Sequence, residues 1–161
     1  MFNKLKTKLI VKRFLKKTPR KKFILPPEKI NSILVLTDNN IPLIESQLKS
    51  FFPKSNFYYL STRKQKNDNS PNNHFLFHAS DLGLGSLKNK KLNQLLTLDF
   101  EVLIDYNRKK SNMDFFIQII NSNLISGYYN SEKNYLYDIL LEGDNMIENL
   151  HKQLNKLTKN E

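Results

Sequence analysis

Two aspartates directly follow the two most apolar segments of the chain, and their position suggests a shared ligand crevice. Asp38 ends the run SILVLTD, and Asp105 ends the run FEVLID. If the two runs form neighbouring parallel strands, the carboxylates reach one edge of the sheet, where open parallel sheets bind ligands. Asn107 and Arg108 would stand beside them as hydrogen-bond donors. The alternative is structural, because aspartate after a strand is also a common turn or cap residue.

The segment DLGLGSLK at residues 81–88 is the one glycine-rich turn of the sequence. Backbone N–H groups in such a turn, placed before a helix, can hold a phosphate. Lys88 occupies the position of the third glycine in a dinucleotide fingerprint, which favours a structural turn with Ser86 as the helix N-cap. His74 and His78 would lie about 13 Å apart along a strand, too far for one metal ion. We therefore expect neither a metal site nor a cofactor, and we assign no catalytic residue.

Positive charge is concentrated at the start of the chain. The first 24 residues contain eight lysines, two arginines and no acid, whereas the remaining 16 basic and 15 acidic residues nearly cancel. Such an arm favours a polyanionic partner. If the partner is nucleic acid, phosphate contacts release counterions, and Phe14 and Phe23 stack on unpaired bases. The candidate phosphate-binding residues are Lys12, Arg13, Lys16, Lys17, Arg20, Lys21 and Lys22.

The same arm permits two other interpretations. On an anionic membrane surface, Phe2, Leu5 and Leu9 would enter the interface while the lysines contact headgroups. A basic arm can also be a solvated tail without a specific partner. Among nucleic acids we favour RNA, because no helix-turn-helix, zinc finger or other DNA-reading motif follows the arm.

The elements that position these residues alternate between strand and helix. Apolar runs predict strands at residues 32–38, 56–60, 74–78, 100–105, 124–129 and 135–141. Amphipathic segments predict helices at residues 2–17, 42–51, 88–98 and 113–121, and a last helix after residue 145. This alternation predicts an α/β fold: a single three-layer Rossmann-like domain with a mostly parallel sheet, preceded by a basic N-terminal helix. We expect an arm at residues 1–24 and a domain at residues 25–161, with a mobile loop at about 63–73.

The order of the segments SILVLTD, DLGLGSLKN, FEVLIDYN, LISGYYN and YDILLEG resembles an uncharacterised family of short basic bacterial proteins, known as a domain of unknown function. More distantly, FEVLIDYN followed by an apolar helix and LISGYYN is similar to the N-terminal half-domain of heptosyltransferase-like glycosyltransferases. Both resemblances imply a Rossmann-like body. The second also implies a reduced glycosyltransferase-like or nucleotide-binding domain.

Composition narrows the remaining functional classes. The chain has 161 residues and no cysteine, which excludes disulfides, thiolate metal sites and cysteine nucleophiles. No apolar run has the length of a membrane-spanning helix or of an export signal, so we expect a cytoplasmic protein. We predict a non-enzymatic binding protein associated with RNA or a ribonucleoprotein such as the ribosome. A peripheral membrane protein is the first alternative, and a glycosyltransferase-like or nucleotide-binding domain with a small-molecule ligand is the second.

Overall fold

The structure is a computed structural model that describes residues 2–15, 22–38, 40–62, 72–129 and 132–159. Lys16, Lys17, Arg20, Lys21 and most of the predicted loop at 63–73 lie outside these residues. Helices (α), 3-10 turns (η) and strands (β) follow in the order α1 (Phe2–Leu15), η1 (Pro27–Lys29), β1 (Ser32–Leu36), α2 (Ile41–Phe51), β2 (Asn56–Thr62), β3 (His74–Phe77), η2 (Ala79–Asp81), α3 (Lys90–Leu95), β4 (Asp99–Asp105), α4 (Asp114–Ile119), β5 (Asn121–Tyr128), η3 (Asn134–Leu136), β6 (Ile139–Leu141) and α5 (Met146–Lys159).

The described residues form one six-stranded sheet in the order β3-β2-β1-β4-β5-β6. All of its strand pairs are parallel. This is the strand order of the Rossmann fold, and it confirms the predicted α/β class. The order in which strands are added to the sheet reverses between β1 and β4, which are parallel neighbours with Leu36 paired to Asp105. The two strands predicted to carry the aspartates are therefore neighbours at the topological switch point.

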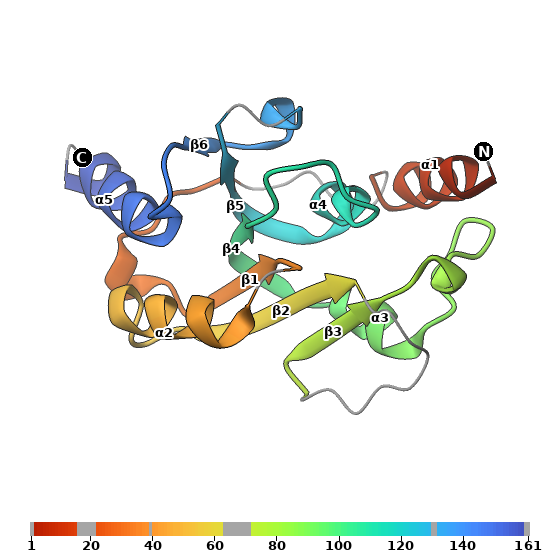
Figure 1. Ribbon diagram of the computed structural model, residues 1–161, viewed down its shortest axis with the longest axis horizontal. Coiled ribbons are helices and arrows are strands. Elements are labelled where there is room, and N and C mark those ends of the chain that lie inside the picture. Colours follow the sequence, from red (N-terminus) through yellow and green to blue (C-terminus); the bar gives the residue numbers. More distant parts are fainter. Residues whose placement is uncertain (1, 16–21, 39, 63–71, 130–131, 160–161) are drawn as a thin grey trace.

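Helices cover both faces of the sheet and give the molecule three layers (Figure 1). Side chains of a strand alternate between the two faces. Ile33 and Val35 of β1 belong to the core cluster that contains the apolar positions of α2 and α5. Leu34 and Leu36 belong to the opposite cluster, which contains those of α1, α3 and α4.

The basic helix α1 packs on this second face. Ile10 is fully buried within the core cluster, and Val11 and Phe14 pack against it from the same side of the helix. The Arg13 guanidinium donates a 3.1 Å hydrogen bond to the carbonyl oxygen of Gly85. The first helix is thus part of the three-layer structure, next to α4.

Three predicted elements differ from the structure more than the others do. The helix expected at 88–98 is shortened to α3, and its N-cap is Asn89, whose side chain accepts from two backbone amides, rather than Ser86. The helix expected at 113–121 ends at Ile119, because β5 begins at Asn121. The strand expected at 135–141 is reduced to β6 and preceded by η3.

Candidate functional site

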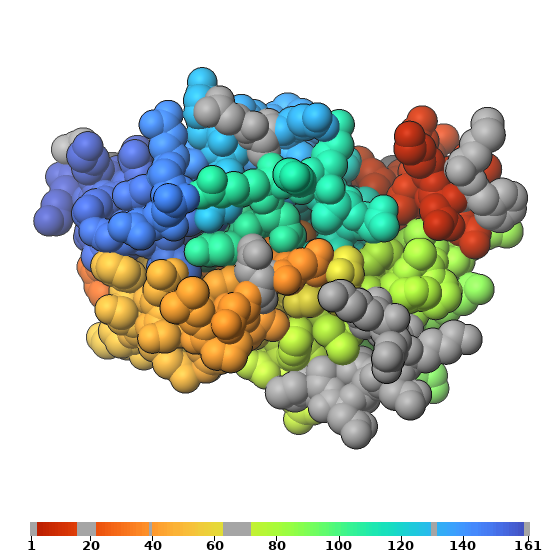
Figure 2. Space-filling model, viewed as in Figure 1, coloured from red at the N-terminus to blue at the C-terminus, as the bar shows by residue number. Residues whose placement is uncertain are grey.

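The exposed cations of α1 form a fixed basic array. Lys4, Lys8, Lys12 and Arg13 are exposed, while Ile10 is buried; Arg13 lies one turn from Ile10 and is bonded to Gly85. Ordering a long side chain on binding costs entropy, and a backbone that is already fixed lowers the total cost. Figure 2 shows α1, in red, at one end of the molecular surface. Lys12 and Arg13, predicted from the sequence, therefore lie on a rigid element.

The other described residues that the sequence predicts to contact nucleic acid differ in their access to a partner. Lys22 forms an ion pair with Asp138, so its charge is partly balanced within the molecule. Phe14, predicted to stack on bases, packs against the core instead. Phe23 remains 47% exposed and accessible to a partner.

At the switch point of the sheet, Asp38, Asn107 and Arg108 line one hollow of about 660 Å³. The Asp38 carboxylate accepts two 2.8 Å hydrogen bonds from Thr62, one from its backbone amide and one from its hydroxyl. The backbone amide of Asp38 donates to Oδ1 of Asn107 at 3.1 Å. These bonds fix the loops that follow β1 and β4 against each other. Three of the four predicted crevice residues are thus brought together.

Aromatic groups form another wall of this hollow. The Arg108 guanidinium lies 4.6 Å from the centre of the Tyr128 ring, and Arg108 also pairs with Asp144. Tyr106 packs edge-on against Tyr128. Burial raises the pKa of the Tyr106 phenol to about 12, so the group stays protonated at physiological pH.

The fourth predicted residue, Asp105, is fully buried at the end of β4. Its carboxylate accepts hydrogen bonds from Lys133 Nζ at 2.5 Å, from the Tyr137 hydroxyl at 2.7 Å and from the backbone N–H of Asn107 at 3.0 Å. Burial raises the pKa of the Asp105 carboxyl, and the Lys133 ammonium and these hydrogen bonds act in the opposite direction. Asp105 therefore anchors the loop after β4 from inside the protein.

Lys133 is a buried residue of this region that sequence reasoning missed. Its side chain is only 1% exposed, and its ammonium also donates to the Asn107 carbonyl and to Asp114, each at 3.2 Å. One buried cation thus joins the end of β4, the loop after it and the start of α4. Its partners lie 19 to 28 residues away in the chain, so no local pattern signals the contact.

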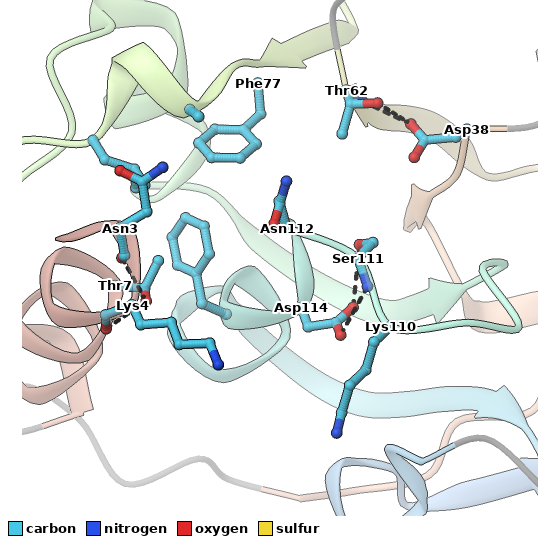
Figure 3. Close-up of a pocket in the computed structure, with 13 residues that line it drawn as sticks. Asn3, Lys4, Thr7, Asp38, Thr62, Phe77, Lys110, Ser111, Asn112 and Asp114 are labelled. Atoms are coloured by element: carbon cyan, nitrogen blue, oxygen red, sulfur yellow. Dashed lines mark hydrogen bonds between the residues drawn. The ribbon is translucent and has the colours of Figure 1, made fainter. Parts of the chain in front are cut away.

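A second hollow, of about 630 Å³, lies between α1 and the switch point. Figure 3 shows Asn3, Lys4 and Thr7 of α1 on one side of it, and Asp38 and Thr62 on the other. Asp38, Lys110 and Ser111 line both hollows, which therefore adjoin. The basic helix and the crevice at the sheet edge form one continuous surface, which we call the arm–crevice surface.

The glycine-rich segment closes on itself as a turn. The backbone amide of Gly83 donates to the Ser86 carbonyl, and that of Lys88 donates to the Asp81 carbonyl, both at 2.8 Å. Gly85 has a φ of +75°, a conformation that glycine adopts without strain. With Arg13 bonded to Gly85, the turn supports the end of α1.

Comparison with known proteins identifies a family but no activity. No curated protein matches the chain significantly. No solved structure matches it significantly either, so the likeness to heptosyltransferase-like enzymes is not confirmed. A family model described as a family of unknown function (DUF6913) matches residues 3–160. Because that match includes α1, the whole sheet and α5, the chain belongs to this family of unknown function.

Proposed function

We propose that the protein is a non-enzymatic, cytoplasmic binding protein that associates with RNA or a ribonucleoprotein through its basic N-terminal helix. The observation that carries the proposal is the fixed array of Lys4, Lys8, Lys12 and Arg13, held in place by the burial of Ile10. The helix contains no acidic residue that would compete for these charges.

Phosphate contacts explain why such an array favours a nucleic acid. Each lysine that neutralises a phosphate releases condensed counterions, and the gain in affinity needs no base-specific contact. A helix rises 1.5 Å per residue, so the cations between Lys4 and Arg13 extend over roughly 13 Å. This length spans several phosphates of a single strand.

The experiment measures binding of the full chain to a labelled oligoribonucleotide by fluorescence anisotropy, at several salt concentrations. Replacing Lys4, Lys8 and Lys12 with glutamine should weaken binding and lower the slope of log K against log salt by about 2. A matched control replaces three exposed lysines on the α2–α5 side. This control set is Lys54→Gln, Lys156→Gln and Lys159→Gln.

The control variant and the α1 variant lose the same net charge. Comparing them therefore distinguishes RNA binding at α1 from a general attraction between RNA and a basic protein. Equal loss in both triple variants would contradict the proposal, as would the absence of RNA binding by the unmodified chain. Sedimentation of the protein with ribosomes, sensitive to ribonuclease and dependent on the three α1 lysines, would identify a ribonucleoprotein as the partner.

One observation favours a second candidate, a peripheral membrane protein. Leu5 and Leu9 are 53% and 39% exposed on α1, among its lysines. Apolar side chains flanked by cations are typical of helices that lie in an anionic membrane interface. Within the described residues, no helix has the length and apolar character needed to cross a bilayer.

Vesicle flotation with phosphatidylserine separates the two candidates. Leu5→Ser with Leu9→Ser should release a membrane-bound protein and leave RNA affinity unchanged. Leu157→Ser is the matched control, because Leu157 is 42% exposed on α5. Flotation that does not depend on the two α1 leucines would exclude this candidate.

A further inference from the structure

The arm–crevice surface contains hydrogen-bonding groups that backbone phosphates alone do not require. Asn3, Thr62, Ser111 and Asn112 line the hollow next to α1, together with Lys4 and Lys110 (Figure 3). Amide and hydroxyl side chains supply both donors and acceptors, which match the edges of nucleobases. Lys4 of α1 supplies a positive charge at this hollow, whereas Lys110 is paired with Glu132, and the carboxylates of Asp38 and Asp114 also line the hollow.

One donor beside Asp38 has no hydrogen-bond partner among the residues that the structure describes. The Nδ2 atom of Asn107 is buried and makes no hydrogen bond, although the Oδ1 atom of the same side chain accepts from Asp38. An unsatisfied buried donor costs free energy, which an acceptor on a bound molecule would recover. Asn107 lines the hollow at the switch point, but its Nδ2 atom is itself covered, so this donor reaches a bound molecule only if the side chain turns toward the hollow.

The shape of the surface distinguishes between two forms of RNA. The hollows have volumes of about 630 and 660 Å³, in the usual range of sites that enclose a small molecule. In a duplex the base edges are paired, and the deep groove of A-form RNA does not admit side chains. An unpaired nucleotide can enter a hollow, and its base can stack on a guanidinium plane such as that of Arg108 beside Tyr128.

We propose that the arm–crevice surface binds single-stranded RNA, with an unpaired nucleotide in the crevice between α1 and the switch point. This inference rests on the proposed function and specifies its substrate. The lysines of α1 contact the flanking phosphates. Asn112, Ser111 and Asn107 supply the polar contacts to the nucleotide, and Lys133 holds their loop in position from within the protein.

The test compares a labelled, unstructured oligoribonucleotide with the duplex formed by the same strand and its complement, using the full chain. The single strand should bind at least about tenfold more tightly. Asn112→Trp, which fills the hollow with a bulky ring, should weaken single-strand binding by about tenfold and leave duplex binding unchanged. Gln153→Trp on the exposed side of α5 should change neither.

Outcomes separate this inference from the proposed function. Equal affinity for the two RNA forms, with loss of both on neutralising Lys4, Lys8 and Lys12, would overturn the inference and keep the proposed function. No binding of either form would overturn both. Should Asn112→Trp reduce the thermal stability of the fold, Asn112→Ala is measured instead, and the comparison of the two RNA forms on the unmodified chain needs no variant.

Discussion

Lys133 places a full positive charge in the protein interior, where its partners decide whether it stabilises or destabilises the fold. Desolvation of an ammonium costs several kcal/mol unless close anions and hydrogen bonds compensate. Asp105 and Asp114 supply the two anions and the Asn107 carbonyl supplies a further acceptor. Among the described residues, these contacts provide an acceptor for each N–H group of the ammonium.

Replacing Lys133 with methionine should destabilise the protein by about 3–5 kcal/mol, because the Asp105 carboxylate would stay buried without its cation. Chemical unfolding in urea measures the change. Adding Asp105→Asn should recover part of the loss, since it removes the unpaired charge. Lys54→Met, at an exposed lysine, should change stability by less than about 0.5 kcal/mol. A similar effect at both lysines would show that the buried contacts contribute little.

The position of the Tyr137 ring leaves no room for a side chain at Gly127. A Cβ atom at this position would lie 2.2 Å from the ring, although the glycine backbone itself is unstrained. Gly127→Ala should therefore destabilise the protein by about 1–3 kcal/mol by displacing the ring from Asp105. In a Tyr137→Ala background the same substitution should cost much less, and the double-mutant cycle measures this coupling. Additive effects would contradict the contact.

At the scale of elements, α1 serves as a structural helix and as the basic surface. Ile10→Ala should reduce stability by about 2–5 kcal/mol, because Ile10 is fully buried. Leu9→Ala on the exposed side should reduce it by less than about 1 kcal/mol. Thermal unfolding of the two variants provides the comparison. Equal, small effects would mean that the helix is only loosely attached to the sheet.

Most strands could be predicted from the sequence because buried parallel strands are continuous apolar runs. SILVL and FEVLID carry this signal, and both form central strands. Their adjacency, which brings Asp38 and Asn107 into one crevice, follows from strand order, and no local pattern encodes that order. Sequence reasoning thus located the candidate residues, while only the three-dimensional structure separates Asp105 from the other three.

The prediction of a single strand at 135–141 is wrong, because alternating aromatic residues do not distinguish a strand from a folded loop. Tyr135 is 79% exposed, whereas Tyr137 turns inward to Asp105. Asp138 donates its own backbone amide to the Ile125 carbonyl and accepts the Ile125 amide with its side chain. The Asp138 carboxylate therefore takes the place of a backbone carbonyl as the acceptor for the Ile125 amide of β5.

The sequence also did not indicate which face of α1 is buried. Its apolar residues are distributed around the helix, with Leu5 and Leu9 on one side and Ile10 and Phe14 on the other. Both sides have comparable hydrophobicity, so only the position of α4 decides which side the protein covers.

At the scale of the whole molecule, the sheet should be most stable at its centre. β1 and β4 are each paired on both sides, whereas β3 and the three-residue β6 are edge strands. Amides of β4 should exchange with solvent only on global unfolding, and amides of β3 and β6 should exchange faster through local opening. Hydrogen exchange followed by mass spectrometry tests this order. Equally slow exchange at the edges would contradict it.

The positions of α1 and α5 at opposite ends of the long axis also determine where a reporter group can be attached (Figure 1). Since the chain contains no cysteine, Lys156→Cys on the exposed side of α5 would provide a single thiol for a fluorophore or a solid support. Coupling there leaves the arm–crevice surface facing solution. An affinity tag joined to α1 would instead crowd the cations whose binding is to be measured.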